Sequence, residues 1–526
     1  MAQAIGRSAP SIQPRLSASW LRRLPRATLA HVWLAVPLFA AGLGTGLMPV
    51  ESIDYWWTVK LGELIWQAGA LPDGDQLVFT PIREPVIHAQ WLAQLVYYAA
   101  HSLGGPALAL ALRTIVALVV ALLLVRIATD AGAGPRGTAL AVGAGMLIVL
   151  PGLALRPQML AVIPFLLIAR ASCSPPRTLA GALVLAMTFA VWANVHGSFV
   201  LGYVLLSGGL AQAVWDRRQG RRDESIARLS RLAAICVVAP LVNPNGLALV
   251  TYVWDTVVFN GVGSTVGILG VEWGPPALRS TYGGAFFASL LVAIVLLGRG
   301  HRPRLGESLL LILFGLMATQ AVRHVLWWGL IVTPYVARGL SAWASPPSRP
   351  ARRDDEASEV ARAPDDIPAG TPALNTACLV LFATLVLACL PWWRASTPLP
   401  SDRTAILDRE TPIAVGEYLA THQPPGELFN FTDWGAYFAW RLGPSRRVFV
   451  DDRFELHPGD VWRDYSTVGR GHVSWEEVLE RYGVTQLALD PKSQAGLVQA
   501  VERSPRWVLS YEDERALVYE RTPRER

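Results

Sequence analysis

Long apolar runs separated by short polar segments make up most of the first 393 residues. A helix of about 17–25 apolar residues is long enough to cross a bilayer. We place such runs at 29–50, 105–126, 137–155, 157–170, 178–193, 198–215, 231–249, 283–299, 306–322, 325–342 and 375–393. The run 157–170 is short for a full span, and Pro240 and Pro244 interrupt the run 231–249. The pattern predicts an all-α polytopic membrane protein with about eleven transmembrane helices.

The arginines between these runs predict the orientation of the chain. Cytoplasmic loops of membrane proteins carry an excess of Lys and Arg. With the N-terminus in the cytoplasm, every second loop is rich in arginine, as in 217–231, whereas the alternate loops hold few. An odd number of spans then puts the C-terminal segment outside. The first run has no small-residue cleavage site, so we interpret it as an uncleaved anchor.

The first predicted outer loop, residues 51–104, begins with the acids Glu51, Asp54 and Glu63 and a dense group of aromatic residues. Its middle is rich in Pro, Gly and Asp. Apolar residues at helical spacing predict an amphipathic helix on either side of this middle: Trp57, Leu61, Leu64, Ile65 and Ala68 on the first, and Trp91, Leu95, Tyr98 and Ser102 on the second. Because Trp and Tyr favour the membrane–water boundary, we expect both helices to lie on the bilayer surface.

Composition divides the chain into five segments: a cytoplasmic tail at 1–28, a transmembrane core at 29–344, a cytoplasmic linker at 345–374, a last span at 375–393 and an extracytoplasmic domain at 394–526. The linker is rich in Pro, Ala and charged residues, which predicts disorder. In the last segment, ELFNF, RRVFV, TQLAL, RWVLSY and ALVYER have strand patterns, whereas EEVLERYGV and SQAGLVQAVERS have helix patterns. This alternation predicts a small α/β domain.

Composition also narrows the class of function. The chain is 52% hydrophobic and 16% charged, whereas soluble proteins have about 25% charged residues. Its net charge of +6 comes with arginines in the loops, which membrane topology explains without nucleic acid. The four cysteines and nine histidines show no metal-ligand spacing, so no dedicated metal site is predicted. The sequence has no Gly-rich phosphate loop, dinucleotide fingerprint or Ser-His-Asp arrangement, which disfavours a nucleotide-using enzyme.

Polar residues that are out of place beside apolar runs gather, under this orientation, at the outer ends of the spans: Asp54, Glu63, His88, Arg156, Gln158, Asn194, His196, Asn243, Asn245, Glu272, Arg323 and His324. Ionisable groups in or beside a span are costly unless they are paired or used. Several at one depth indicate a wet cavity open to the outside. There, Asp54 could take a proton from an incoming hydroxyl, and Arg156 and Arg323 could hold a phosphate through bidentate guanidinium groups.

Each of these residues also has a simpler interpretation. Asp54 could be only the N-cap of the helix that follows it, and Glu63 could lie on the solvated face of that helix. Arg156 and Arg323 could anchor lipid headgroups. The histidines are more often satisfied polar residues at helix starts than metal ligands.

The C-terminal domain carries two further candidates. The triplet Asp451, Asp452 and Arg453 follows a predicted strand, and strand ends are common ligand sites in α/β folds. A solvated turn is the simpler interpretation of this triplet. The aromatic segment 432–443 could pack the domain on the membrane core or stack against sugar rings.

The order of several short tracts resembles the GT-C superfamily of membrane glycosyltransferases. The resemblance is to the branch of protein O-mannosyltransferases and aminoarabinose transferases, and more closely to an uncharacterised bacterial set of GT-C-like proteins. The shared tracts are D-x-W-W at 54–57 with Gly62, G-x-x-P-x-x-D at 69–75, W-L at 91–92, R-P-Q at 156–158, W-x-N-x-H-G at 192–197, N-P-x-G at 243–246, E-W at 272–273, R-H at 323–324, W-G at 434–435 and F-x-D-x-R at 449–453. The chain departs from many relatives at Thr58, where His is common, and in the spacing of Glu51 and Asp54.

The resemblance implies an enzyme of the bacterial inner membrane. It would take a sugar from a polyprenyl-phosphate carrier on the outer face and pass it to a lipid, glycan or protein acceptor. Asp54 would be the general base, and Glu51 and Glu63 are further catalytic candidates. Contacts to the substrates are expected from His88, Trp91, Arg156, Gln158, Asn194, His196, Asn243, Glu272, Arg323 and His324.

The sequence leaves the partners, the cofactor and one rival function open. Membrane lipids are expected partners, and a divalent cation such as Mg²⁺ or Mn²⁺ is left open as a cofactor. The rival interpretation is a non-catalytic scaffold for envelope assembly or a lipid-linked sugar transporter. A transporter would carry polar groups at mid-bilayer, whereas here they gather on one side.

Overall fold

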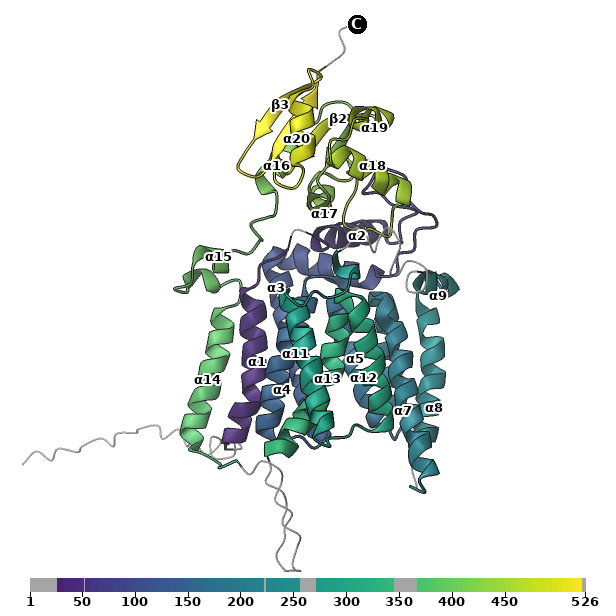
Figure 1. The fold of residues 1–526 in the computed structure, drawn as a ribbon, viewed down its shortest axis with the longest axis vertical. Coiled ribbons are helices and arrows are strands. Elements are labelled where there is room, and N and C mark those ends of the chain that lie inside the picture. Colours follow the sequence, from purple (N-terminus) through teal and green to yellow (C-terminus); the bar gives the residue numbers. More distant parts are fainter. Residues whose placement is uncertain (1–25, 52, 222–223, 256–270, 345–366, 523–526) are drawn as a thin grey trace, which may run out of the picture.

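The computed structural model describes residues 26–51, 53–221, 224–255, 271–344 and 367–522. Figure 1 shows a bundle of long helices with a small α/β domain at one end. The helices of the bundle are α1 Leu29–Leu47, α3 Trp91–Asp130, α4 Pro135–Val149, α5 Pro157–Cys173, α6 Leu179–Val195, α7 Val200–Arg218, α8 Ser225–Val238, α11 Thr281–Gly298, α12 Leu305–Gln320, α13 Val325–Ala344 and α14 Pro372–Ala388. The predictions for the tail before residue 26 and for the linker at 345–366 fall outside the described residues.

Several of these helices have the length and apolar composition of membrane spans. Among the described residues, six helices meet both criteria, and four more are apolar but shorter. The protein is therefore a membrane protein, as the apolar runs predict.

Two helices depart from the predicted runs. α3 joins the predicted second surface helix to the following span, with a kink where Gly104 and Gly105 leave helical geometry. α8 ends at Val238, ahead of Pro240, and a short helix, α9 Leu247–Trp254, follows the break.

The helix α2 Tyr55–Ala68 lies across one end of the bundle, between α3 and the helix α17 Thr432–Leu442 of the C-terminal domain (Figure 1). Close approach to α3 requires Gly62, because a Cβ there would lie 2.1 Å from the carbonyl oxygen of Gln94. Trp56 is 2% exposed, with its ring 4.5 Å from that of Trp440 and 5.1 Å from that of Tyr437. α2 is thus held between two layers of protein.

This packing corrects the prediction that the aromatic residues of α2 face the bilayer surface. Tyr55, Trp56 and Trp57 are buried, and of the aromatic residues of α2 only Trp66 is exposed, at 69%. The helical spacing of the apolar residues predicts a helix but does not say what covers it. In the structure, the C-terminal domain covers the first two turns.

The C-terminal domain is an α/β domain, as predicted. Its sheet has the order β1-β2-β4-β3, with β1 and β2 parallel and the other pairs antiparallel. The strands are β1 Glu427–Asn430, β2 Val484–Leu489, β3 Trp507–Glu512 and β4 Leu517–Arg521. The accompanying helices are α16 Ile413–Thr421, α17, α18 Gly459–Gly469, α19 Trp475–Arg481 and α20 Ala495–Glu502, whereas the short helix α15 Ser401–Thr404 lies near the end of α14 (Figure 1).

The predicted strand RRVFV is not part of this sheet. Val448 makes only isolated bridges, to Val78 on one side and Leu428 on the other. The side chain of Asn430 takes the place of a strand ladder, because its amide accepts from the Phe449 N–H and donates to the Val450 carbonyl, both at 2.9 Å. Because no strand ladder holds the segment after residue 448 in the sheet, this segment can turn toward the bundle.

The interface between α2 and the C-terminal domain predicts the effect of two substitutions. Trp56→Ala removes a large buried side chain and should destabilise the protein by about 3–5 kcal/mol. Trp66→Ala, on the exposed end of the same helix, should leave stability within about 0.5 kcal/mol. Chemical denaturation of the detergent-solubilised protein measures the free energy of unfolding of both variants. Equal stability of the two variants would contradict the buried position of Trp56.

Candidate active site

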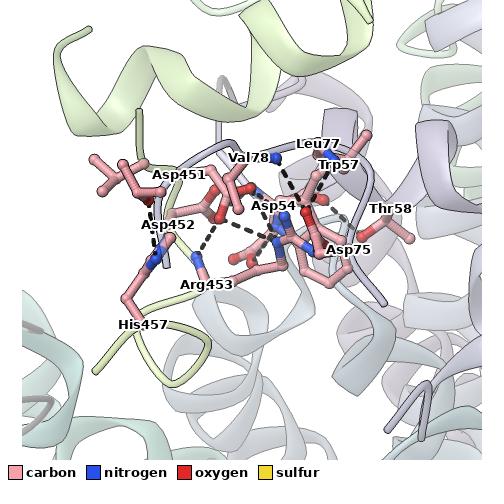
Figure 2. Close-up of polar contacts among 12 residues, drawn as sticks. Asp54, Trp57, Thr58, Asp75, Leu77, Val78, Asp451, Asp452, Arg453 and His457 are labelled. Atoms are coloured by element: carbon pink, nitrogen blue, oxygen red, sulfur yellow. Dashed lines mark hydrogen bonds and ion pairs between the residues drawn. The ribbon is translucent and has the colours of Figure 1, made fainter. Parts of the chain in front are cut away.

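A turn in a strained conformation lies at the end of the bundle that carries the C-terminal domain. Asp54, which precedes α2, has φ 25° and ψ −42°, and among the described residues it is the one non-glycine with positive φ. Such a conformation costs of order 1–3 kcal/mol and persists only where surrounding contacts impose it. The Asp54 N–H donates to Oδ2 of Asp452 at 2.8 Å, and its carbonyl accepts from Thr58 Oγ1 at 2.6 Å (Figure 2). Contacts from the C-terminal domain and from α2 itself therefore fix this residue.

The Asp54 carboxylate does not cap α2, although the residue occupies the N-cap position. Its Oδ2 lies 2.5 Å from Nε of Arg156 in an ion pair, and its Oδ1 accepts from the Trp57 indole at 3.3 Å. Nη1 of Arg156 in turn lies 2.6 Å from both carboxylate oxygens of Glu272. Burial alone would lower the pKa of Arg156, but Asp54 and Glu272 outweigh it and raise that pKa above its usual value. Arg156 is thus a permanent cation between two acids.

A second arginine extends this line of charges. The guanidinium of Arg323 lies 3.9 Å from the centre of the Trp273 ring, a cation–π contact. Burial lowers the pKa of Arg323, and attraction to Glu272 partly opposes this shift. Burial and the neighbouring Arg323 together lower the pKa of His196 to about 3, so this histidine is neutral at physiological pH.

The charged cluster (Asp54, Arg156, Glu272 and Arg323) therefore unites segments that are far apart in the chain. Each segment enters it at the end of a helix: the turn before α2, the N-terminus of α5, and the 3₁₀ turns η6 Val271–Trp273 and η7 Val322–His324. Glu51 lies beside the cluster, where burial raises the pKa of its carboxyl group and Arg156 opposes the shift. The predicted gathering of polar residues at one end of the spans is observed for these members.

The C-terminal domain reaches this site through a buried arginine. Arg453 is 8% exposed; its Nη2 lies 2.6 Å from Oδ2 of Asp451, and its Nη1 pairs with Asp75 of the outer loop. Asp75 also accepts from the N–H groups of Leu77 and Val78 at 2.8 and 3.0 Å. The Arg453 cluster (Asp75, Asp451 and Arg453) ties the outer loop to the domain, so the prediction of a solvated turn at 451–453 is wrong.

A cavity of about 480 Å³ lies beside the site. Its walls come from α2, the loop before α3, α9 and the segment after Asp452: Trp57, Leu61, Arg83, Glu84, Pro85, Val86, Ile87, His88, Ala89, Gln90, Gln94, Ala248, Thr251, Tyr252, Asp255, Arg453, Glu455 and Leu456. Trp57 connects it to the strained turn, because its indole donates to Asp54. Glu455 also connects the two, since it interacts electrostatically with both Arg323 and Asp54. The cavity is large enough for a sugar-sized group.

Other predicted site residues make structural contacts outside the charged cluster. The Trp91 indole donates to Asn194 at 2.6 Å, and the Asn243 amide donates to the Ala193 carbonyl at 3.1 Å; both bonds join neighbouring helix ends. Glu63 lies on α2, paired with Lys60 at 2.9 Å, and therefore does not join Asp54.

The remaining three candidates lie near the site but make no contact with Asp54 that the structure shows. Nε2 of His88 lies 3.1 Å from the Pro72 carbonyl, and burial lowers the pKa of His88, which lines the cavity. Nδ1 of His324 lies 3.0 Å from the Met317 carbonyl. Gln158 is half-buried in the first turn of α5.

Sequence reasoning missed Glu455. It carries no motif, and only the path of the chain after Arg453 brings it to Arg323.

Within the described ranges, no group of three His, Cys, Asp or Glu side chains is arranged to hold a metal ion. Asp54 and Glu272 both face Arg156 instead.

Neither a family model nor a curated protein matches the sequence. Solved structures are similar. The oligosaccharyltransferase of Archaeoglobus fulgidus in complex with Zn and sulfate is 12% identical with a TM-score of 0.53, over 93% of this chain and 73% of that chain. ArnT from Cupriavidus metallidurans bound to undecaprenyl phosphate is 13% identical with a TM-score of 0.46, over 96% and 98%. Arabinosyltransferase EmbB from Mycobacterium smegmatis is 14% identical with a TM-score of 0.39, over 96% and 47%.

At such identity, the likeness to the archaeal oligosaccharyltransferase shows the fold alone. That fold agrees with the membrane helix bundle and small C-terminal α/β domain that the sequence predicts. The similarity extends over nearly the whole chain, so it includes both the helical bundle and the domain at its end.

The Arg453 cluster predicts a large loss of stability when its cation is removed. Arg453→Gln leaves Asp75 and Asp451 buried without a counter-charge, which should cost about 3–5 kcal/mol. Arg447→Gln, at an exposed position six residues earlier, is the matched control and should unfold like the unchanged protein. Urea titration measures the free energy of unfolding of both variants. An Arg453→Gln protein as stable as the unchanged protein would contradict the ion pairing of Arg453 with Asp75 and Asp451.

Proposed function

We propose that this protein is a membrane glycosyltransferase that moves a sugar from a polyprenyl-phosphate carrier to an acceptor on the extracytoplasmic face, with Asp54 as the general base. The observation that carries the proposal is the strained Asp54, ion-paired to Arg156 within a charged cluster at one end of the bundle. Residues in strained conformations cluster at active sites. The shared fold with an oligosaccharyltransferase agrees with this class of reaction.

The charged cluster suits a phosphate-bearing donor. Two carboxylates pair with Arg156, and because the Glu272 side chain is 49% exposed, an incoming phosphate can reach this guanidinium and take the place of Asp54. Arg323 lies close enough to Glu272 to interact with the same anion. As the phosphate takes over Arg156, the Asp54 carboxylate becomes free to accept a proton. Preorganised guanidinium groups then stabilise the charge that develops on the departing phosphate.

The reaction is a single displacement that inverts the anomeric carbon. The acceptor hydroxyl gives its proton to Asp54, and its oxygen forms a bond to the anomeric carbon. The bond from that carbon to the phosphate oxygen breaks, and its electron pair stays on the polyprenyl phosphate. The acceptor approaches from the cavity lined by Trp57 and Glu455, since this cavity adjoins the turn that holds Asp54.

The arginine-rich loops support an extracytoplasmic site. The segment 217–231 carries six arginines, and the end of α7 at Arg218 and the start of α8 at Ser225 lie at the end of the bundle opposite to the C-terminal domain (Figure 1). Because arginine-rich loops stay in the cytoplasm, the C-terminal domain and Asp54 belong on the other side of the bacterial inner membrane.

Removal of the proposed base tests the function most simply. Asp54→Asn should reduce sugar transfer by about 10²- to 10⁴-fold, the contribution of a general base. Asp73→Asn, an exposed acid of the same loop, is the matched control and should retain full activity. The assay mixes the purified protein with a panel of polyprenyl-phosphate sugars and membrane extract as acceptor. Absence of transfer by the unchanged protein, together with full complementation by Asp54→Asn in cells, would favour the scaffold.

Donor binding is tested separately from chemistry. Arg323→Gln removes a charged hydrogen-bond donor worth about 1.5–3 kcal/mol, which corresponds to an affinity for undecaprenyl phosphate roughly 10- to 100-fold weaker. Arg279 is exposed near the start of α11, so Arg279→Gln should bind undecaprenyl phosphate as tightly as the unchanged protein does. Calorimetry in lipid nanodiscs measures both dissociation constants. Equal affinities would place the phosphate elsewhere.

A further inference from the structure

The C-terminal domain places a second carboxyl group against Asp54. Oδ2 of Asp452 accepts the Asp54 N–H at 2.8 Å, which brings the two carboxyl groups close enough to interact electrostatically. Its other oxygen, Oδ1, is buried and has no hydrogen-bond partner in the described part of the chain. Figure 2 shows Asp452 beside Asp451, on the side of Asp54 away from Asp75. A buried carboxylate oxygen without a donor is costly unless it carries a proton.

The neighbouring cations do not neutralise Asp452, because each is occupied by other acids. Arg453 is paired with Asp451 and Asp75. Arg156 is paired with Asp54 and Glu272. The charges that act most strongly on Asp452 are the carboxylates of Asp54 and Asp451, and after burial they are the main causes that raise its pKa well above the usual value.

We propose that Asp452 is a positioning residue of the active site, which holds the strained Asp54 turn through its backbone N–H and shares a proton with the Asp54 carboxylate. This inference rests on the proposed function for its catalytic meaning, but its geometry does not depend on that function. The C-terminal domain would then complete the active site rather than only cover it.

The shared proton has a defined role in the reaction. A neutral Asp452 can donate to the Asp54 carboxylate, which avoids the repulsion of two adjacent negative charges. During transfer the acceptor proton goes to Asp54, while the proton of Asp452 stays in place. After the product leaves, Asp54 releases the transferred proton to water. The carboxyl groups of Asp54 and Asp452 then again share a single proton.

The pH dependence of stability follows from this arrangement. The pKa of Asp452 is raised in the folded state above the value of about 3.9 that an unfolded chain gives. The folded protein therefore binds more protons, so this contribution is complete below the unfolded pKa and is lost as pH rises through the folded pKa. Asp452→Asn removes the titration and keeps the hydrogen bond from the Asp54 N–H, and its amide can donate to the Asp54 carboxylate as the protonated acid would.

Thermal unfolding of the full-length detergent-solubilised protein tests the shared proton without any substrate. From about pH 4 upward, the unfolding midpoint of the unchanged protein should fall relative to that of Asp452→Asn. Asp460→Asn, an exposed acid of the same domain, should follow the unchanged protein. Parallel curves for the unchanged protein and Asp452→Asn would overturn the proposal.

A second variant keeps the test decisive if Asp452→Asn does not fold. Asp54→Asn removes the nearest negative charge, so Asp452 should ionise at lower pH and the pH dependence of the midpoint should flatten. A curve parallel to that of the unchanged protein would overturn the shared proton. This result is independent of catalysis, so failure of the proposed function remains distinguishable.

Where transfer is measurable, the kinetics separate positioning from general stability. At neutral pH, Asp452→Asn should keep most of kcat, whereas Asp452→Ala should lose roughly tenfold or more, because nothing then holds the strained turn. KM should change little in either variant, since neither change touches the arginines or the cavity. Equal loss in the Asn and Ala variants would overturn the positioning role.

Discussion

The buried guanidinium of Arg453 is the interaction on which the arrangement of the site depends. A cation removed from water is tolerated only when carboxylates pair with it, and here the partners are Asp451 of the C-terminal domain and Asp75 of the outer loop. This pairing draws the segment after Asp75 against the segment around Val448. It thereby encloses α2 and brings Asp452 to Asp54, which holds that residue in a conformation it would not otherwise adopt.

The site next to this cluster is nearly balanced in charge before any substrate arrives. Arg156 lies between Asp54 and Glu272, and Arg323 lies over an aromatic ring near the same acids. Such a set is stable at low dielectric because each charge has a counter-charge. In the proposed reaction, a phosphate that takes the place of Asp54 on Arg156 releases this carboxylate for proton transfer. Binding of the donor and activation of the base are then a single exchange of partners.

The sequence predicts the bundle well, because lipid requires long apolar runs and leaves little freedom in where helices begin and end. It also identifies Asp54, Arg156 and Arg323, since charges beside apolar spans are rare. It does not predict what covers α2 or the role of Asp452. Those depend on a contact between residues 398 positions apart, and local periodicity carries no signal for docking at that distance. Glu63 has the same local signal as Asp54, and only packing separates them.

The measurement that tests the central claim most directly is a structure of the protein with undecaprenyl phosphate in a lipid nanodisc. The account predicts that the phosphate lies within hydrogen-bonding distance of both Arg156 and Arg323, and that the Asp54 carboxylate has moved from Arg156 toward the cavity. A phosphate bound at the opposite end of the bundle, or one that leaves the pair between Asp54 and Arg156 unchanged, would contradict it.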